Sequence, residues 1–222
     1  MQTEEWKSSM QLLKSRLNDL NAKSALLRFT AAKISQNLPT ALEEIGFKKH
    51  HDRIEYKTLL SELPDEAGTP LTWKAVGTEG LDLEFAAKIM SRCSEGDPNL
   101  EPGFNSLESV KVDLADEELY HQQDAIHIGY LNNEPVAFVF AQTSPETGWA
   151  RLTYVGVVPE ARGQGLGIWM HRHGLAMMRA QGGIEYHGGT VAANKAMIKT
   201  FEKNGCKELR RMQDWTLSSN EL

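Results

Sequence analysis

A nine-residue segment, PEARGQGLG at residues 159–167, combines one arginine with three glycines at alternate positions. Glycine has no side chain, so a ligand can approach the backbone closely at each of these positions. The segment follows a strand-like run and leads into a helix-like run, and a helix N-terminus has unpaired N–H groups that favour an anion. These residues therefore indicate either a phosphate-binding loop or a tight structural turn.

Two better-known phosphate motifs do not fit this loop. A P-loop requires a lysine after its last glycine, and the segment has none. The dinucleotide-binding pattern Gly-x-Gly-x-x-Gly would place its third glycine at Ile168 or at Met170, depending on which glycine starts it. A pyrophosphate still fits such a loop, with Arg162 adding positive charge.

Residues 157–167 resemble the acyl-CoA motif of the GCN5-related N-acetyltransferases (GNATs), in which Arg/Gln-x-x-Gly-x-Gly follows a strand that ends in Val-x-Pro. A second stretch follows the order of that family's Asn-x-x-Ala-x-x-x-Tyr-x-x-x-Gly-Phe pattern, with Asn194, Met197, Phe201 and Gly205-Cys206 at the corresponding positions. The resemblance extends over about residues 70–219.

The resemblance implies a mixed α/β (α+β) GNAT acyl-CoA N-acyltransferase fold, a mostly antiparallel sheet flanked by helices, with acetyl-CoA held where two strands splay apart. The residues that it implies for cofactor binding are Val157, Val158, Arg162, Gly163, Gln164, Gly165, Leu166, Gly167, Asn194 and Phe201. Gly156 would suit a bulge that opens the strand, because bulges favour glycine.

The reaction implied is direct attack by a primary amine of a small molecule or peptide on the thioester of acetyl-CoA. A base must first take a proton from the ammonium, and an acid then protonates the leaving thiolate. Phe201 stands where the family commonly has a tyrosine acid, and phenylalanine cannot donate a proton. The remaining candidates for proton transfer are Tyr154, Tyr186 and His187, whereas Glu160 is expected to face solvent.

Two other functions compete with the enzyme. Phe201 and the lack of an evident base favour a non-catalytic acyl-CoA-binding or regulatory module. A scaffold or dimerisation protein is the third hypothesis, because an apolar stripe on a predicted N-terminal helix could pack on the domain or on a second copy. The residues of that stripe are Trp6, Met10, Leu13, Leu17 and Leu20.

Periodicity and turn residues predict the order of the elements. Helices are expected at 1–22, 80–92, 106–119, 168–181 and 193–205. Strands are expected at 71–76, in a hairpin over 125–142 with Asn132-Asn133 as its turn, at 147–158, at 185–193, and as two strands or one bent hairpin over 206–217. Residues 62–70 are predicted to be a linker, and 93–105 a loop that could cover the acceptor site.

The segments 41–59 and 200–217 resemble each other. In each, a glycine follows a short amphipathic helix and precedes an aromatic residue by ten positions, which gives the pairs Gly46/Tyr56 and Gly205/Trp215. Residues 1–68 are therefore predicted to be an N-terminal extension and either a remnant of a GNAT repeat or a chance likeness. Residues 69–222 are predicted to form the acetyltransferase domain, with one cofactor site.

The composition of the chain argues against several classes of partner. The 222-residue chain has a formal net charge of −6, which gives no footprint for nucleic acid. No apolar run could span a bilayer and the N-terminus lacks the apolar core of a signal peptide, so a cytoplasmic protein without membrane contact is expected. Two cysteines without a CxxC, and histidines without i, i+4 spacing, predict no metal site.

Overall fold

The computed structural model describes residues 2–19, 24–33, 37–63, 68–78, 80–100, 106–114 and 124–218. Its helices are α1 (Gln2–Asp19), α2 (Leu38–Glu44), α3 (Leu83–Ser94), α4 (Ser106–Leu114), α5 (Leu166–Ala180) and α6 (Lys195–Lys203), with short 3-10 turns at Ala31–Lys33, Leu60–Glu62 and Pro159–Ala161. Its strands are β1 (Ser24–Thr30), β2 (Lys48–Leu59), β3 (Thr72–Ala75), β4 (Ile126–Leu131), β5 (Glu134–Thr143), β6 (Trp149–Val157), β7 (Glu185–Val191) and β8 (Lys207–Ser218).

The strands form one eight-stranded sheet in the order β1-β8-β2-β7-β6-β5-β4-β3. The pairs β1–β8, β3–β4, β4–β5 and β5–β6 are antiparallel, whereas β6 and β7 run parallel. The predicted mixed α/β fold with a mostly antiparallel sheet is confirmed.

The C-terminal segment corrects one prediction. Residues 206–217 were expected to form two strands or a bent hairpin, but Lys207–Ser218 is a single strand. Its partner explains the difference, since β1 pairs with β8 without interruption from Thr30↔Met212 to Ser24↔Ser218. The pairing joins segments far apart in the sequence, so local patterns could not reveal it.

Several other expectations hold, with altered ends. Asn132 and Asn133 have φ values of 52° and 67°, as the tight turn between β4 and β5 requires. Helix α3 begins at Leu83 because the Asp82 carboxylate accepts the N–H of Phe85 at 2.7 Å. Helix α3 extends through Ser94, so the loop predicted at 93–105 starts after that residue. Three parts of the predictions lie outside the described residues: 101–105 of this loop, 64–67 of the predicted linker and 115–119 of the predicted second helix.

The chain divides into two compact units. The first comprises residues 1–55, 191–193 and 209–222, and the second comprises 56–190 and 194–208. The first unit has its own apolar core of five buried residues, Leu38, Leu42, Phe47, Trp215 and Leu217. Leu13, Ile45 and three residues of β1, Ala25, Leu27 and Phe29, pack against it. Of the predicted N-terminal stripe, Leu13 thus lies against a core; Leu20 and the side chains of Trp6, Met10 and Leu17 are outside what the structure describes.

Both segments that resemble each other have the same local conformation. Helix α2 ends before Gly46 at φ 98° and β2 follows, and helix α6 ends before Gly205 at φ 76° and β8 follows. A positive φ explains the glycine at each place. Descent of the first 68 residues from a repeat, with a boundary at 68/69, stays a prediction.

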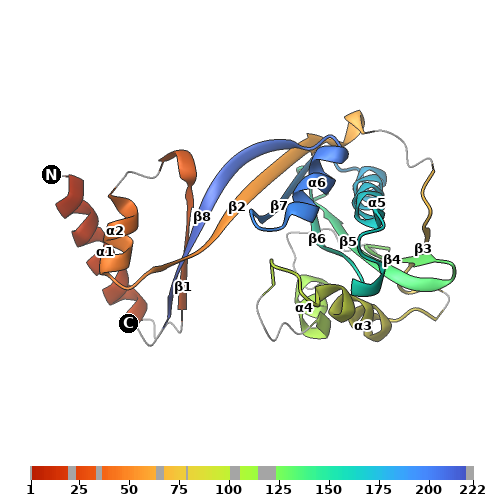
Figure 1. Cartoon of the computed structure of the whole chain (residues 1–222), viewed down its shortest axis with the longest axis horizontal. Coiled ribbons are helices and arrows are strands. Elements are labelled where there is room, and N and C mark those ends of the chain that lie inside the picture. The colour runs from red at the N-terminus through yellow and green to blue at the C-terminus, as the bar shows by residue number, and fades with distance from the viewer. Residues whose placement is uncertain are drawn as a thin grey trace. The chain divides into compact units, whose positions relative to one another are not determined.

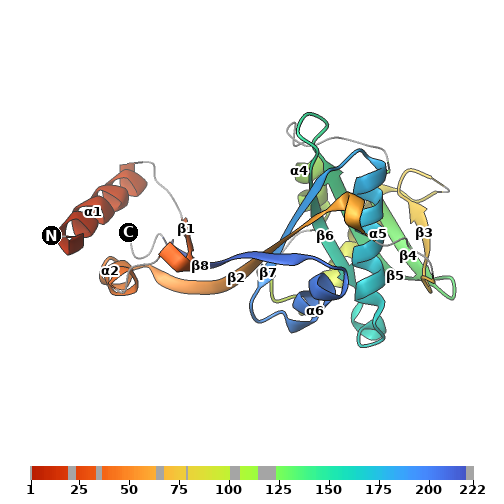
Figure 2. The ribbon, with the colours of Figure 1, turned by 90° about the horizontal axis from the view of Figure 1, so that it is seen from above.

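Helices cover both faces of the sheet in the second unit (Figure 1; Figure 2). Helix α5 packs on one face so closely that a Cβ added at Gly174 would lie 2.5 Å from Leu152. Helix α3 packs on the other face, where a Cβ at Gly156 would lie 2.6 Å from Cys93. Between them, β5 contributes fully buried side chains at Ala137–Ala141. None of the described helices is long and apolar enough to cross a membrane.

Candidate functional site

A groove of about 480 Å³ lies at the N-terminal end of α5, entirely within the second unit. Four segments build it: the end of α3 with the loop after it, the last residues of β6, the glycine loop with the first turns of α5, and the N-terminal half of α6. The lining residues are Cys93, Gly96, Asp97, Pro98, Val155, Gly156, Val157, Ala161, Arg162, Gly163, Gly165, Leu166, Gly167, Ile168, Met170, Asn194, Ala196, Met197, Lys199 and Thr200.

The glycine loop is shaped for an anion. Gly163 and Gly165 have φ values of 78° and 77°, and a Cβ added to either would meet no atom within 4 Å. Gly165 is the N-cap of α5 and carries no side chain that could satisfy the first N–H groups of the helix. Unpaired N–H groups at the positive end of a fifteen-residue helix can bind phosphate oxygens.

Arg162 holds two walls of this groove together. Its Nε donates to the carbonyl of Val157 at 3.0 Å, and its Nη2 donates to the carbonyl of Cys93 at 3.0 Å. The guanidinium therefore ties the end of β6 to the last turn of α3. It also places a fixed positive charge beside the glycine loop.

Asn194 forms the N-terminus of α6 at the opposite wall. Its Oδ1 accepts the N–H of Met197 at 3.0 Å, which is a helix N-cap interaction. The cap fixes the first turn of α6, whose residues Ala196, Met197, Lys199 and Thr200 line the groove. The sequence motif thus marks a residue that organises the local structure.

Three of the ten sequence-predicted cofactor residues are not among those that line the groove. Gln164 is exposed, and Val158 is fully buried beneath the loop. Phe201 is also buried: it stacks on Tyr56 at 4.5 Å between ring centroids and meets the edge of His171 at 5.1 Å. Phe201 therefore supports α6 from the core side.

Strands β6 and β7 part close to their beginnings. They pair in parallel at Trp149↔Glu185 and Ala150↔Tyr186, with no further register pair along the two described strands. A register shift between Phe140 and Ala141 of β5 leaves one extra residue, Thr153, in β6. The bulge expected at Gly156 thus lies at Thr153, and Gly156 is instead needed for the close approach of Cys93.

Two of the predicted proton-transfer residues are enclosed. The Tyr154 hydroxyl lies 3.4 Å from the Asp97 carboxylate, and burial, followed by that charge, raises its pKa above the usual range. The Tyr186 hydroxyl lies 3.2 Å from Nε2 of His171, and burial raises its pKa as well. Neither side chain lines the groove.

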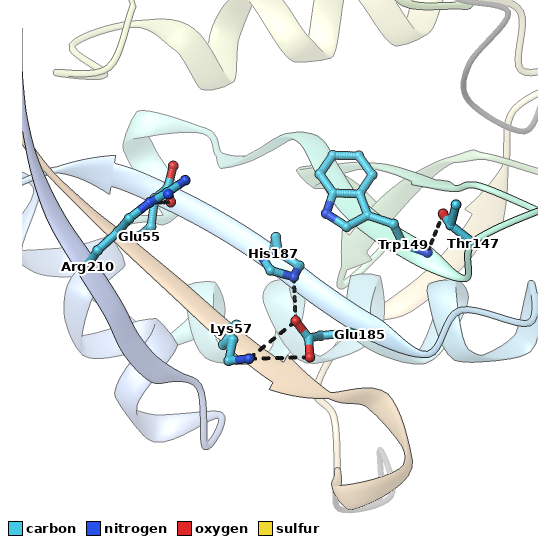
Figure 3. Close-up of polar contacts among 7 residues, drawn as sticks. All are labelled: Glu55, Lys57, Thr147, Trp149, Glu185, His187 and Arg210. Carbon is cyan, nitrogen blue, oxygen red and sulfur yellow. Dashed lines mark hydrogen bonds and ion pairs between the residues drawn. The ribbon is translucent and has the colours of Figure 1, made fainter. Parts of the chain in front are cut away.

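The third candidate, His187, does not line the groove either, but its side chain is 31% exposed. Its Nε2 lies 2.5 Å from Oε1 of Glu185, and Nζ of Lys57 lies 3.4 Å from Oε2 of the same carboxylate (Figure 3). Partial burial would raise the pKa of Glu185, but the hydrogen bond from His187 and the charge of Lys57 lower it on balance. Glu160, expected to face solvent, has a side chain 61% exposed and pairs with Arg92.

The sequence assigned residues 93–105 to a loop that could cover the acceptor site, but it did not indicate that the end of α3 and the residues after it form a wall of this groove. Cys93, Gly96, Asp97 and Pro98 precede the glycine loop by more than sixty positions and belong to no recognised motif. The one signal that could have indicated it is Gly156, because an unexplained glycine within a strand marks the close approach of another segment. Among the described residues, no group of three or more His, Cys, Asp or Glu side chains could hold a metal ion.

Comparison with known proteins identifies the class. The model of the acetyltransferase (GNAT) family matches residues 94–206, just over half of the chain, so the chain belongs to this family. The family is one of acetyltransferases, which use acetyl-CoA and act on amines. A comparison with curated protein sequences gave no significant match.

Solved structures share the fold at low sequence identity. A GCN5-related N-acetyltransferase from Sphaerobacter thermophilus superimposes with a TM-score of 0.66 at 15% identity, covering 88% of this chain and 59% of that one. A conserved protein of unknown function from Staphylococcus epidermidis gives 0.67 at 16% identity, covering 97% and 81%. A GCN5-related N-acetyltransferase from Kribbella flavida gives 0.61 at 14%, covering 96% and 76%. This chain thus spans less than two thirds of the Sphaerobacter protein.

Proposed function

We propose that this protein transfers the acetyl group of acetyl-CoA to a primary amine of a small molecule or peptide. The observation that carries the proposal is the groove at the N-terminus of α5, where a loop with two left-handed glycines meets a helix end that has no side-chain cap. Membership of the GNAT family supports the same assignment.

We assign the parts of acetyl-CoA to the walls of the groove as follows. Backbone N–H groups from Arg162 to Gly167 bind the pyrophosphate, with Gln164 contributing only its backbone. The edge of β6 at Val155–Val157 accompanies the pantetheine arm, because β7 leaves this edge unpaired. Asn194 holds the α6 wall in place, and Val158 and Phe201 support the groove from the buried side.

The reaction follows from these placements. The amine, once it has lost its ammonium proton, attacks the thioester carbonyl carbon; the C–N bond forms and the C–S bond then breaks. Backbone N–H groups of β6 near the bulge at Thr153 stabilise the developing oxyanion. Phe201 has no proton to give, so the proton that the nitrogen loses as the amide forms reaches the departing thiolate through water in the open groove.

Ligand-dependent thermal unfolding tests the cofactor assignment. A ligand that binds only the folded state stabilises it by about 2.7 kcal/mol at a hundredfold excess over its Kd. We expect acetyl-CoA to raise the melting temperature, and acetate at the same concentration to leave it unchanged. An unchanged melting temperature at millimolar acetyl-CoA would contradict the assignment.

A non-catalytic acyl-CoA-binding module is the second candidate. It is favoured by Phe201 and by the enclosure of the Tyr154 and Tyr186 hydroxyls. Both candidates bind acetyl-CoA, but only the enzyme releases the thiol of CoA when an amine is added. A panel of polyamines, amino acids, aminoglycosides and lysine peptides separates the two, since the module gives no amine-dependent thiol with any of them.

A further inference from the structure

His187 and Glu185 lie on the face of β7 that is turned away from α5. The side chain between them in sequence, Tyr186, points the other way and contacts His171 of α5. Trp149, the register partner of Glu185, shares their face. This is the face on which α3 contacts β6 at Gly156, so the three side chains share a side of the sheet with the α3 wall of the groove.

His187 also stands where the two parallel strands part. The last register pair between β6 and β7 is Ala150↔Tyr186, and His187 follows directly. It is therefore the first residue on this face of β7 beyond the paired region. Acetyl-CoA in the proposed position extends along β6 from Val157 toward this point, so its acyl end approaches the place where the strands part.

The contact with Glu185 fixes which nitrogen of His187 can accept a proton. A carboxylate can only accept hydrogen bonds, so Nε2 of His187 carries the proton that Glu185 accepts (Figure 3). In the neutral ring the other nitrogen, Nδ1, then has a lone pair. Within the part of the chain that the structure describes, Nδ1 makes no hydrogen bond.

The surroundings of His187 are partly exposed, and the charged groups named near it are Glu185, Lys57 and Arg151. The side chains of His187, Glu185 and Lys57 are 31%, 33% and 44% exposed, and the Trp149 ring lies 6.2 Å from the imidazole. Lys57 on β2 pairs with Glu185 and so holds the carboxylate in place. Arg151, two residues beyond Trp149 on β6, donates to Gln142, and Trp149 itself is neutral.

We infer that Nδ1 of His187 takes the proton from the acceptor ammonium, and that Glu185 is the positioning residue that sets the tautomer and stabilises the imidazolium. The inference rests on the proposed function and deepens it. One ammonium proton goes to Nδ1 and later to solvent. The second leaves the nitrogen as the C–S bond breaks and goes through water to the thiolate sulfur, so acetyl-CoA and RNH₃⁺ give the acetamide, CoA thiol and H⁺.

The test is the pH profile of kcat/KM for the amine of the panel that wild type acetylates fastest, read as CoA thiol release. We expect His187→Gln to lower kcat/KM at pH 7 by about 100-fold or more, within the range for general bases. Its rate should then rise with pH as the free amine becomes more abundant. Glu185→Gln should move the acidic limb to lower pH, because the imidazolium loses its carboxylate partner.

Matched variants separate proton transfer from damage to the fold. His50→Gln changes an exposed strand histidine, and Glu55→Gln removes a strand carboxylate that pairs with Arg210 (Figure 3). Both should keep the wild-type rate and pH profile. All variants are first checked for wild-type acetyl-CoA stabilisation in thermal unfolding, which shows that the groove is intact.

Two failures can be told apart. If wild type acetylates an amine and His187→Gln keeps both its kcat/KM and its acidic limb, the assignment of His187 is overturned while the proposed function stands. If wild type acetylates none of the amines, the proposed function fails and this inference falls with it. An unshifted limb in Glu185→Gln overturns the positioning role alone.

Discussion

At the scale of single residues, the backbone conformation of two glycines gives the strongest indication of a ligand. Gly163 and Gly165 adopt positive φ although no neighbouring side chain requires the space, since a Cβ there would meet nothing within 4 Å. Open space in front of a left-handed glycine is what a bound phosphate would need. Gly182, which follows α5 at its other end with φ 84°, has equal space but does not line the groove.

The comparison of Gly165→Ala with Gly182→Ala tests this indication. Each change puts a Cβ on a left-handed residue, which costs about 1–2 kcal/mol of stability. Only Gly165→Ala places that methyl group in the groove, and we expect it to raise the Kd for acetyl-CoA about tenfold or more. Calorimetric titration measures both, and equal Kd values in the two variants would contradict the location of the pyrophosphate.

His171 makes stability depend on pH through a different residue-scale effect. It is fully buried, and burial lowers its pKa to about 3, whereas the unfolded chain has a histidine pKa of about 6.5. Between these values the unfolded state binds one more proton than the folded state. Stability should therefore fall as pH decreases, by about 1.4 kcal/mol per unit from this group.

Urea unfolding between pH 6 and pH 4 checks the contribution of His171. We expect His171→Gln to reduce the slope of unfolding free energy against pH by about 1.4 kcal/mol per unit, which corresponds to one proton. His50→Gln, at an exposed position, should keep the wild-type slope. Equal slopes in wild type and His171→Gln would show that the buried imidazole does not remain neutral.

At the scale of elements, the groove depends on how closely α3 approaches β6. Gly156 has no space for a side chain because Cys93 of α3 lies against it, and Arg162 ties the same two elements through their carbonyls. Gly167 of α5 is different, since a Cβ there would lie 3.5 Å from Thr200, an ordinary contact.

We therefore expect opposite results from two alanine substitutions in the same groove. Gly156→Ala should lower the free energy of unfolding by about 1–3 kcal/mol, because it overpacks the contact between helix and strand. Gly167→Ala should leave it unchanged or raise it by up to about 1 kcal/mol, because alanine favours the helix. Urea denaturation measures both free energies of unfolding. An unchanged free energy in Gly156→Ala would contradict the close contact between α3 and β6.

The sequence predicted most elements because their signals are local. The hairpin turn at Asn132-Asn133 and the strand–loop–helix unit around residues 159–167 depend on neighbouring residues, and both are present. The strand β8, the bulge at Thr153 and the α3 wall of the groove depend on partners distant in the sequence. Phe201 shows the same limit, because a motif gives its position but not that its ring is enclosed.

At the scale of the whole molecule, the two compact units have separate cores. Phe47 belongs to the core of the first unit, and Phe201 is on the buried face of α6 in the second unit; both side chains are 1% exposed. Every residue that lines the groove belongs to the second unit. A substitution at Phe47 should therefore lower stability alone, whereas a substitution at Phe201 should lower both stability and the affinity for acetyl-CoA.

Alanine at each phenylalanine tests this separation. Both changes should cost about 3–5 kcal/mol of stability in urea unfolding, as for other buried phenylalanines. Phe201→Ala should also weaken acetyl-CoA binding, because α6 loses its support, whereas Phe47→Ala should leave the Kd within about twofold of wild type. A large loss of affinity in folded Phe47→Ala would refute the separation.

The central claim, that this chain moves an acetyl group from acetyl-CoA to an amine, is tested most directly by following both products of one reaction. Free CoA thiol and acetylated amine are quantified together while the panel of amines is supplied one at a time. We predict that with at least one amine the two products appear in equal amounts, and only when protein, acetyl-CoA and amine are all present. Thiol release that does not depend on the amine, or no release with any amine, would contradict the account.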